Sequence, residues 1–159
     1  MAALDLLPYL AAGLLLVAGA SKVRRPDTMA DVLSTIGVTG PSAPLILGLA
    51  EILLGAMALV FGGFVLWGSI TAFYLAFAAL IAMLIRNDVE VSCGCFGQHS
   101  SPVGRRQVLA NLVSAGLATT GVVINTPGLI DADRTAVVTA LLVVGIVIGV
   151  PTLRRLHSG

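Results

Sequence analysis

The sequence predicts an all-α fold: a polytopic membrane helical bundle with a four-helix core and a fifth, C-terminal transmembrane helix. Hydrophobic residues make up 57% of the 159-residue chain and charged residues 11%, and the mean hydropathy is +1.02. Soluble domains contain about 25% charged residues, so this chain could not cover a folded surface in water. The length fits one integral membrane domain over residues 1–159, with lipid as its surroundings. The net charge of +1 gives no reason to expect a nucleic-acid partner.

Five apolar stretches are long enough to cross a bilayer. A transmembrane helix needs about 20 mostly apolar residues to cross about 30 Å of hydrocarbon. Because unpaired backbone groups are costly in lipid, each stretch is expected to be helical. No Lys or Arg precedes the first stretch, and Asp5 stands there instead, which favours a retained span over a cleaved signal peptide. The expected spans are residues 4–23, 44–61, 64–85, 107–125 and 135–153.

The basic residues indicate how the spans are oriented. Eight of the nine Lys and Arg residues follow the first span, separate the third from the fourth, or follow the fifth. With five spans these regions share one side, which the positive-inside rule makes cytoplasmic. We therefore expect a multi-pass protein of the plasma membrane with its N-terminus outside. Its C-terminus and the loop 86–106 would be cytoplasmic. Phe61, Phe64 and Trp67 would form an aromatic belt at the opposite interface.

Small residues recur every three or four positions in three of the spans, which places them on one face of each helix. Such faces let membrane helices approach closely, so we expect them to line the bundle interior. The three faces, including the polar residues at the same spacing, are Gly48, Glu51, Gly55, Ala58 and Gly62 in the second span, Ser69, Ala72, Ala76 and Ala79 in the third, and Asn111, Ser114, Ala118, Gly121 and Asn125 in the fourth.

Two further segments have helical signals of their own. Asp27 is expected to cap a short helix that reaches Ile36, stops at Gly37 and lies in the interface plane. In the fifth span, Gly145 and Gly149 form a Gly-x-x-x-Gly motif that could dock on the bundle or on a second copy. A homo-oligomer is therefore left open.

The loop 86–106 contains the only two cysteines, in the string Cys93-Gly94-Cys95-Phe96-Gly97. An extended chain separates Cα atoms two residues apart by about 6.6 Å, whereas bridged Cα atoms lie about 5.5–6 Å apart. Gly94 permits the tight turn that a bridge needs, and Gly97 permits a second turn. Closing so small a loop removes little chain entropy, and a strained bridge is easily reduced. These properties favour a redox role over a structural one.

Two other uses of the cysteines stay open. Two thiolates and His99 could bind zinc, copper(I) or an iron–sulfur centre, with Asp88 or Glu90 as a fourth ligand. The cysteines could also be unreactive. No cofactor is required by the sequence, and a quinone or a metal is left open.

Glu51 lies about 10 Å inside the second span, in the membrane half that holds the cysteine loop. An ionisable group there is costly and suggests function, such as moving the proton of thiol–disulfide exchange, although a structural role is equally consistent. By depth, Lys22 and Arg106 are its nearest cations. Lys22 could instead snorkel to the head groups, and either cation could favour a thiolate. Asn111 could bond Glu51 or the loop, and His99 could shuttle protons or be solvated.

Four parts of the chain together resemble the MauE family of methylamine-utilisation membrane proteins, which is related to the DoxX-like four-helix proteins. They are AGASKVRRP at 18–26, LAEILLG at 49–55, CGCFG at 93–97 and Asn111. The resemblance implies a redox-associated membrane protein that assists maturation of a partner, with disulfide chemistry and a thioredoxin-like or other thiol protein. Lys22, Glu51, Cys93, Cys95 and Asn111 match the family pattern, while the fifth span lies beyond it.

Three functions therefore compete. The first is a membrane thiol–disulfide oxidoreductase in which one cysteine, expected to be Cys93, forms a mixed disulfide that Cys95 resolves. The second is a non-enzymatic assembly factor or membrane anchor. The third is a metal or sulfur carrier that uses the same cysteines. The sequence leaves open whether the protein is an enzyme.

Overall fold

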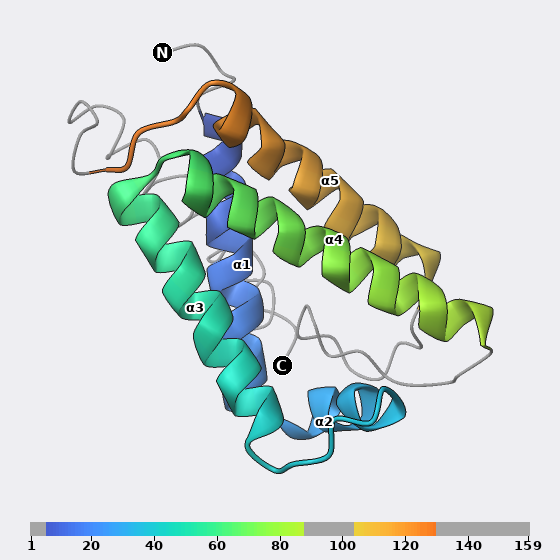
Figure 1. Ribbon diagram of the computed structural model, residues 1–159. Helices are drawn as coiled ribbons and strands as arrows, with labels where there is room; N and C mark the ends of the chain where they lie inside the picture. Colours follow the sequence, from blue (N-terminus) through green and yellow to red (C-terminus); the bar gives the residue numbers. More distant parts are fainter. Residues whose placement is uncertain (1–5, 88–103, 130–159) are drawn as a thin grey trace, which may run out of the picture.

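The computed structural model describes residues 6–87 and 104–129, and this part of the chain is all-α, as predicted. No strand is found there beyond a single bridge between Gly62 and Pro127. The predicted fifth span and the cysteine string lie outside the described residues. The helices are α1 (Leu7–Arg24), α2 (Asp27–Thr35), α3 (Ala43–Phe61), α4 (Phe64–Arg86) and α5 (Arg105–Val123) (Figure 1).

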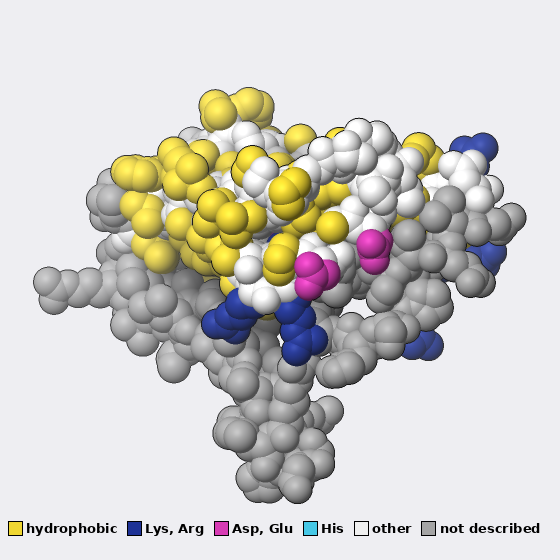
Figure 2. All heavy atoms as spheres, turned by 90° about the horizontal axis from the view of Figure 1, so that it is seen from below, with side chains coloured by type: hydrophobic (Ala, Val, Ile, Leu, Met, Phe, Trp, Pro, Cys, Tyr) yellow, Lys and Arg dark blue, Asp and Glu magenta, His cyan; other side chains and the backbone are white. Residues whose placement is uncertain are grey.

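Three of these helices, α1, α3 and α4, are long and apolar enough to cross a membrane. The outer face of α3 exposes large apolar side chains, and hydrophobic side chains cover a broad area of the surface in Figure 2. Such an area suits contact with lipid and not with water. The fourth expected span forms a helix, α5, but Gln107, Asn111 and two arginines make it more polar. That α5 crosses the membrane therefore stays a prediction.

The four long helices run alternately up and down (Figure 1). The closest pairs are α1 with α3 and α4 with α5, and α1 also contacts α5. From the turn at Gly62 and Gly63, α3 and α4 diverge, and α2 lies at their open end (Figure 1). One end of the bundle therefore gathers the C-terminus of α1, all of α2, the C-terminus of α4 and the N-terminus of α5.

The α1–α3 pair is close because glycines face each other. A Cβ on Gly19 would lie 2.6 Å from the Gly48 carbonyl oxygen, and one on Gly48 would lie 2.9 Å from the Gly19 carbonyl oxygen. Any larger residue would push the two backbones apart. The predicted inner face of the second span is confirmed, since all five of its members are buried: Gly48, Glu51, Gly55, Ala58 and Gly62.

The predicted inner face of the third span is wrong. Ala72, Ala76 and Ala79 are exposed and Ser69 is half-buried, whereas the buried face of α4 consists of Trp67, Ile70, Tyr74, Ala78, Ile81 and Leu84. The physical reason lies in α5, whose predicted small face is buried except for Asn125. A Cβ on Gly121 would lie 2.8 Å from the Trp67 ring. One small-residue helix is enough for a close pair, because the partner can then fill the space with large side chains.

The predicted interfacial aromatic belt is wrong for Trp67. Phe61 and Phe64 are exposed, but Trp67 is 0% exposed. Its ring meets Tyr9 edge to face at 5.8 Å, and its Nε1–H donates to the Thr126 carbonyl oxygen at 2.8 Å. A buried indole N–H needs an acceptor, and the chain that follows α5 supplies one. The same segment also accepts a bond from Tyr9, whose hydroxyl lies 2.7 Å from the Pro127 carbonyl oxygen.

The short helix α2 forms where it was expected, but Asp27 is its first residue and no side-chain hydrogen bond caps it, so the capping prediction is wrong. Its predicted end is confirmed. Gly37 has a φ of +81°, and the Val38 N–H donates to the Leu33 carbonyl oxygen at 3.0 Å, as in a Schellman motif. Met29, Val32 and Leu33 of α2 pack against Leu84 of α4.

Candidate functional site

The main polar feature of the described interior is an ion pair between Lys22 of α1 and Glu51 of α3. The Lys22 Nζ lies 2.7 Å from Oε1 and 2.8 Å from Oε2 of Glu51, and the side chains are 3% and 1% exposed. Lys22 is thus the cation that partners Glu51, one of the two predicted from depth. The alternative in which Lys22 snorkels to the head groups is wrong, because the side chain points into the bundle.

The glycine crossing of α1 and α3 positions this pair. Lys22 lies one turn after Gly19 on α1, and Glu51 lies one turn after Gly48 on α3. A Cβ on Gly48 would lie 3.1 Å from the Lys22 Cβ, and one on Gly19 would lie 2.9 Å from the Glu51 Cβ. Because the two backbones touch one turn away, the charged groups meet with both carboxylate oxygens engaged.

The other long helices complete the surroundings of the pair. The Lys22 Nζ lies 4.9 Å from the centroid of the Phe77 ring on α4, a distance at which a cation is attracted to a ring face. One turn earlier, the Tyr74 hydroxyl donates to the Ala11 carbonyl oxygen at 2.8 Å. Ser114 of α5 is buried as well, at 4% exposed. Each of the four long helices therefore contributes a polar side chain to the interior.

Burying this pair has a large desolvation cost, which a bidentate contact offsets only when the geometry is good. Removing one partner of such a pair typically costs about 3–5 kcal/mol, because the other charge stays buried and unpaired. An apolar pair of similar volume would hold the helices as well or better. Chemically, the pair offers a carboxylate that can take up a proton and an ammonium that can donate one.

The remaining described candidates form no hydrogen bond with this pair. Arg106 is exposed in the first turn of α5 and is not the cation of Glu51. Asn111 is buried, and its Nδ2–H donates to the Gln107 carbonyl oxygen at 2.8 Å, within its own helix. The Gln107 Oε1 accepts from the Gly104 N–H at 2.9 Å. Gln107 thus caps the start of α5, while the Asn111 amide bonds within the first turns of the same helix.

The predicted loop residues, namely Cys93, Gly94, Cys95, Gly97 and His99, lie outside the described residues. The two ends of their loop are described: α4 ends at Arg86, and α5 begins at Arg105. Both ends lie at the end of the bundle that contains α2 and the C-terminus of α1 (Figure 1). Within residues 6–87 and 104–129, no three His, Cys, Asp or Glu side chains are grouped as a metal site would need.

Two residues of the site were not found from the sequence. Tyr74 had a usable signal, since a hydroxyl in the middle of an apolar span needs a buried partner. Phe77 had none, because one phenylalanine among the many apolar residues of α4 does not show which helix it faces.

A family model described as Methylamine utilisation protein MauE matches residues 1–124. None of the curated proteins and none of the solved structures matches the chain.

Proposed function

Because the chain belongs to the MauE family, we propose that it is a membrane protein that assists maturation of a partner by thiol–disulfide exchange through Cys93 and Cys95. The observation that most supports this is the Lys22–Glu51 pair, an acid–base pair buried among apolar helices at the bundle end from which the cysteine loop leaves. Ionisable groups are retained at such depth mainly where they have a function.

In the proposed reaction, the Cys93 thiolate attacks a sulfur of the partner's disulfide. A mixed disulfide forms, and the partner's other sulfur leaves as a thiolate that takes up a proton. The Cys95 thiolate then attacks the Cys93 sulfur, which releases the second partner thiol and leaves a Cys93–Cys95 disulfide. Two electrons pass to the partner, and the reverse sequence oxidises it.

The two cysteines each lose a proton when they become nucleophiles. We propose Glu51 as the group that accepts this proton, with Lys22 as its counter-ion and His99 as a relay in the loop. In this scheme Glu51 is an acid–base residue, whereas Lys22 and Asn111 position other groups. Arg106, exposed at the start of α5, would favour the thiolate form through its charge.

We propose that the exchange takes place at the cytoplasmic face of the plasma membrane, with a thioredoxin-like or other thiol protein as partner. The bundle end next to the loop carries Arg24 and Arg25 at the end of α1, Arg86 at the end of α4, and Arg105 with Arg106 at the start of α5. This supports the positive-inside orientation expected from the sequence. A multi-pass topology with an external N-terminus follows from it.

A second candidate is a non-enzymatic assembly factor or anchor. It is favoured by the completeness of the Lys22–Glu51 contact, in which a single ammonium satisfies both carboxylate oxygens, as in a purely structural pair. A metal or sulfur carrier would depend on the cysteine loop, because the described helices offer no ligand cluster.

Mixed-disulfide trapping in membranes separates these candidates. Cys95→Ser lacks the resolving thiol and is expected to hold a partner through Cys93 in a complex that reductant dissolves. Cys93→Ser is expected to trap far less, and the double serine variant is the matched control that traps nothing. If neither single variant captures a thiol protein, the exchange function is contradicted and the assembly role takes its place.

A further inference from the structure

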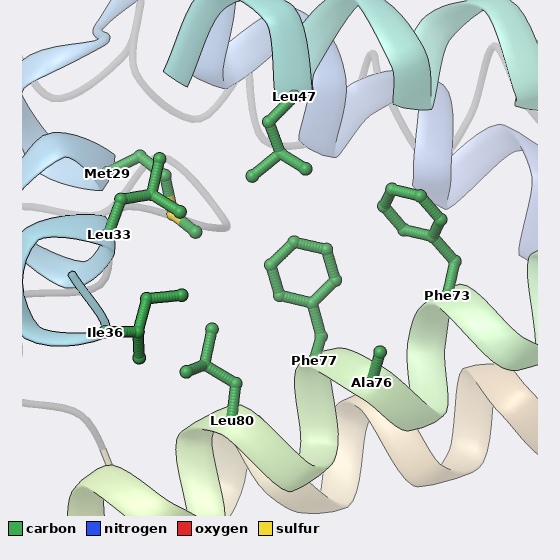
Figure 3. A pocket seen from close by; sticks show the side chains of 8 residues that line it. All are labelled: Met29, Leu33, Ile36, Leu47, Phe73, Ala76, Phe77 and Leu80. Carbon is green, nitrogen blue, oxygen red and sulfur yellow. The ribbon is translucent and has the colours of Figure 1, made fainter. Parts of the chain in front are cut away.

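A pocket of about 210 Å³ lies between α2, α3 and α4, with the Phe77 ring in its wall (Figure 3). Its walls are Met29 and Leu33 from α2, Leu47 from α3, and Phe73, Ala76 and Phe77 from α4 (Figure 3). It forms because α3 and α4 diverge and α2 only partly fills the space between them. Neither the proposed exchange reaction nor the family match gives this pocket a role.

The lining selects for hydrocarbon. Every side chain around the pocket is apolar. A water molecule there would lack the two to four polar partners it needs. The carbonyl groups of a quinone ring would be left without a hydrogen-bond donor. The two long walls, α3 and α4, are helices long and apolar enough to cross a membrane, and in a bilayer such walls would adjoin lipid chains. The group that suits it best is therefore a flexible acyl chain.

The charges around the pocket indicate which lipid would supply the chain. Four exposed arginines stand at this end of the bundle: Arg24 on α1, Arg86 on α4, and Arg105 and Arg106 on α5. Exposed acidic residues at this end are Asp27 and Asp31 of α2, so basic side chains exceed acidic ones among the described residues. Figure 2 shows the two kinds side by side next to the hydrophobic area. Such a balance attracts anionic head groups.

We propose that this pocket binds one acyl chain of an anionic phospholipid, whose head group lies at the arginines beside α2. The bound chain packs on Phe77, whose ring contacts the Lys22 ammonium. Lipid and ring together then keep water from reaching the Lys22–Glu51 pair through the pocket. The lipid is thus a structural ligand that holds α2 against α4.

Contact quenching of a tryptophan by brominated acyl chains tests this. Phe73→Trp places a reporter in the pocket wall, and Leu53→Trp places a control reporter on the outer face of α3, where Leu53 is 62% exposed. The native Trp67 is 0% exposed and gives a constant background. Each variant is reconstituted in phosphatidylcholine vesicles with a rising mole fraction of brominated phosphatidylglycerol. The pocket reporter is expected to reach half-quenching at a mole fraction several-fold lower than the control reporter.

A blocking variant links the result to the pocket. Ala76→Leu, added to the pocket reporter, fills the cavity and is expected to remove the low-mole-fraction quenching. Ala72→Leu, one turn earlier on the same exposed face of α4 and outside the pocket, is the matched control and should not change it.

Four outcomes overturn the proposal. Equal half-quenching of both reporters shows only ordinary lipid contact. Equal preference for brominated phosphatidylcholine shows that the head group is not selected. No quenching of the pocket reporter at any mole fraction shows that protein, from this chain or a second copy, fills the pocket. Quenching by decylubiquinone but not by brominated lipid makes the occupant a quinone.

Discussion

Lys22 and Glu51 form a bidentate ion pair across the α1–α3 contact, with the ammonium nitrogen 2.7 and 2.8 Å from the two carboxylate oxygens. The pair sits one turn from the point where Gly19 and Gly48 bring the two backbones together. Close backbone approach and charge pairing are therefore parts of the same arrangement, and each can be tested separately.

Removing one partner of this pair should destabilise the protein strongly. Lys22→Met or Glu51→Leu leaves the other charge buried, and each is expected to lower the free energy of unfolding by about 3–5 kcal/mol. The double variant leaves no buried charge and should recover most of this loss. Denaturant unfolding in detergent measures the effect, with the exposed Arg24→Met as a control that should change little. If each single variant unfolds with the same free energy as the wild type, the stability of the protein does not depend on pairing these two charges.

Adding a methyl group at the glycine crossing should separate α1 from α3. Gly48→Ala would place a Cβ 2.9 Å from the Gly19 carbonyl oxygen, and overpacking of this kind costs about 1–3 kcal/mol. At Gly116, on the exposed side of α5, a Cβ would meet nothing within 4 Å, so Gly116→Ala should leave stability equal or slightly higher. Thermal unfolding of the two alanine variants, compared side by side, checks this. Equal midpoints would contradict a tight crossing.

The buried tryptophan should stabilise the opposite end of the bundle. Trp67→Phe removes the hydrogen bond to the Thr126 carbonyl oxygen and part of the edge-to-face contact with Tyr9, so unfolding should become easier by about 1–3 kcal/mol. Phe64→Leu, one turn away and 63% exposed, is the matched control and should have a small effect. Wild-type fluorescence should also resist quenching by aqueous acrylamide. Strong quenching would place Trp67 at the interface, as the sequence suggested.

Thiol accessibility should reveal the side of the membrane on which the cysteine loop lies. In intact cells, a permeant maleimide is expected to label Cys93 or Cys95 and an impermeant one is not, because the loop is predicted to be cytoplasmic. Labelling that increases after reduction would indicate that the pair forms a disulfide. Labelling by the impermeant reagent would reverse the predicted orientation.

The parts of the fold predicted correctly follow from single-helix patterns. The observed ends of the four long helices lie within three residues of the predicted spans, because hydrophobic length alone sets them. The buried face of α3 was predictable for a similar reason, since its small residues and Glu51 share one helical spacing. The partner of Glu51 could be narrowed to Lys22 and Arg106 from depth alone.

The wrong predictions concern features that depend on contacts between two helices. Whether Ala76 or Tyr74 of α4 faces inward depends on the small face of α5, and no pattern within α4 contains that information. Trp67 is buried because Thr126, 59 residues away, supplies an acceptor. The position of Phe77 against Lys22 and the pocket beside it depend on how α3 and α4 diverge, which only the assembled bundle determines.

The rate of partner capture in the charge-free double variant tests the central claim most directly. In a Cys95→Ser background, the rate at which Cys93 forms the mixed disulfide in membranes is compared with and without Lys22→Met and Glu51→Leu together. Because that double variant should remain folded, a slower rate reports lost proton transfer and not unfolding. We predict a rate lower by about 100-fold, the lower range of general acid–base contributions. An unchanged rate would show that the ion pair takes no part in the exchange.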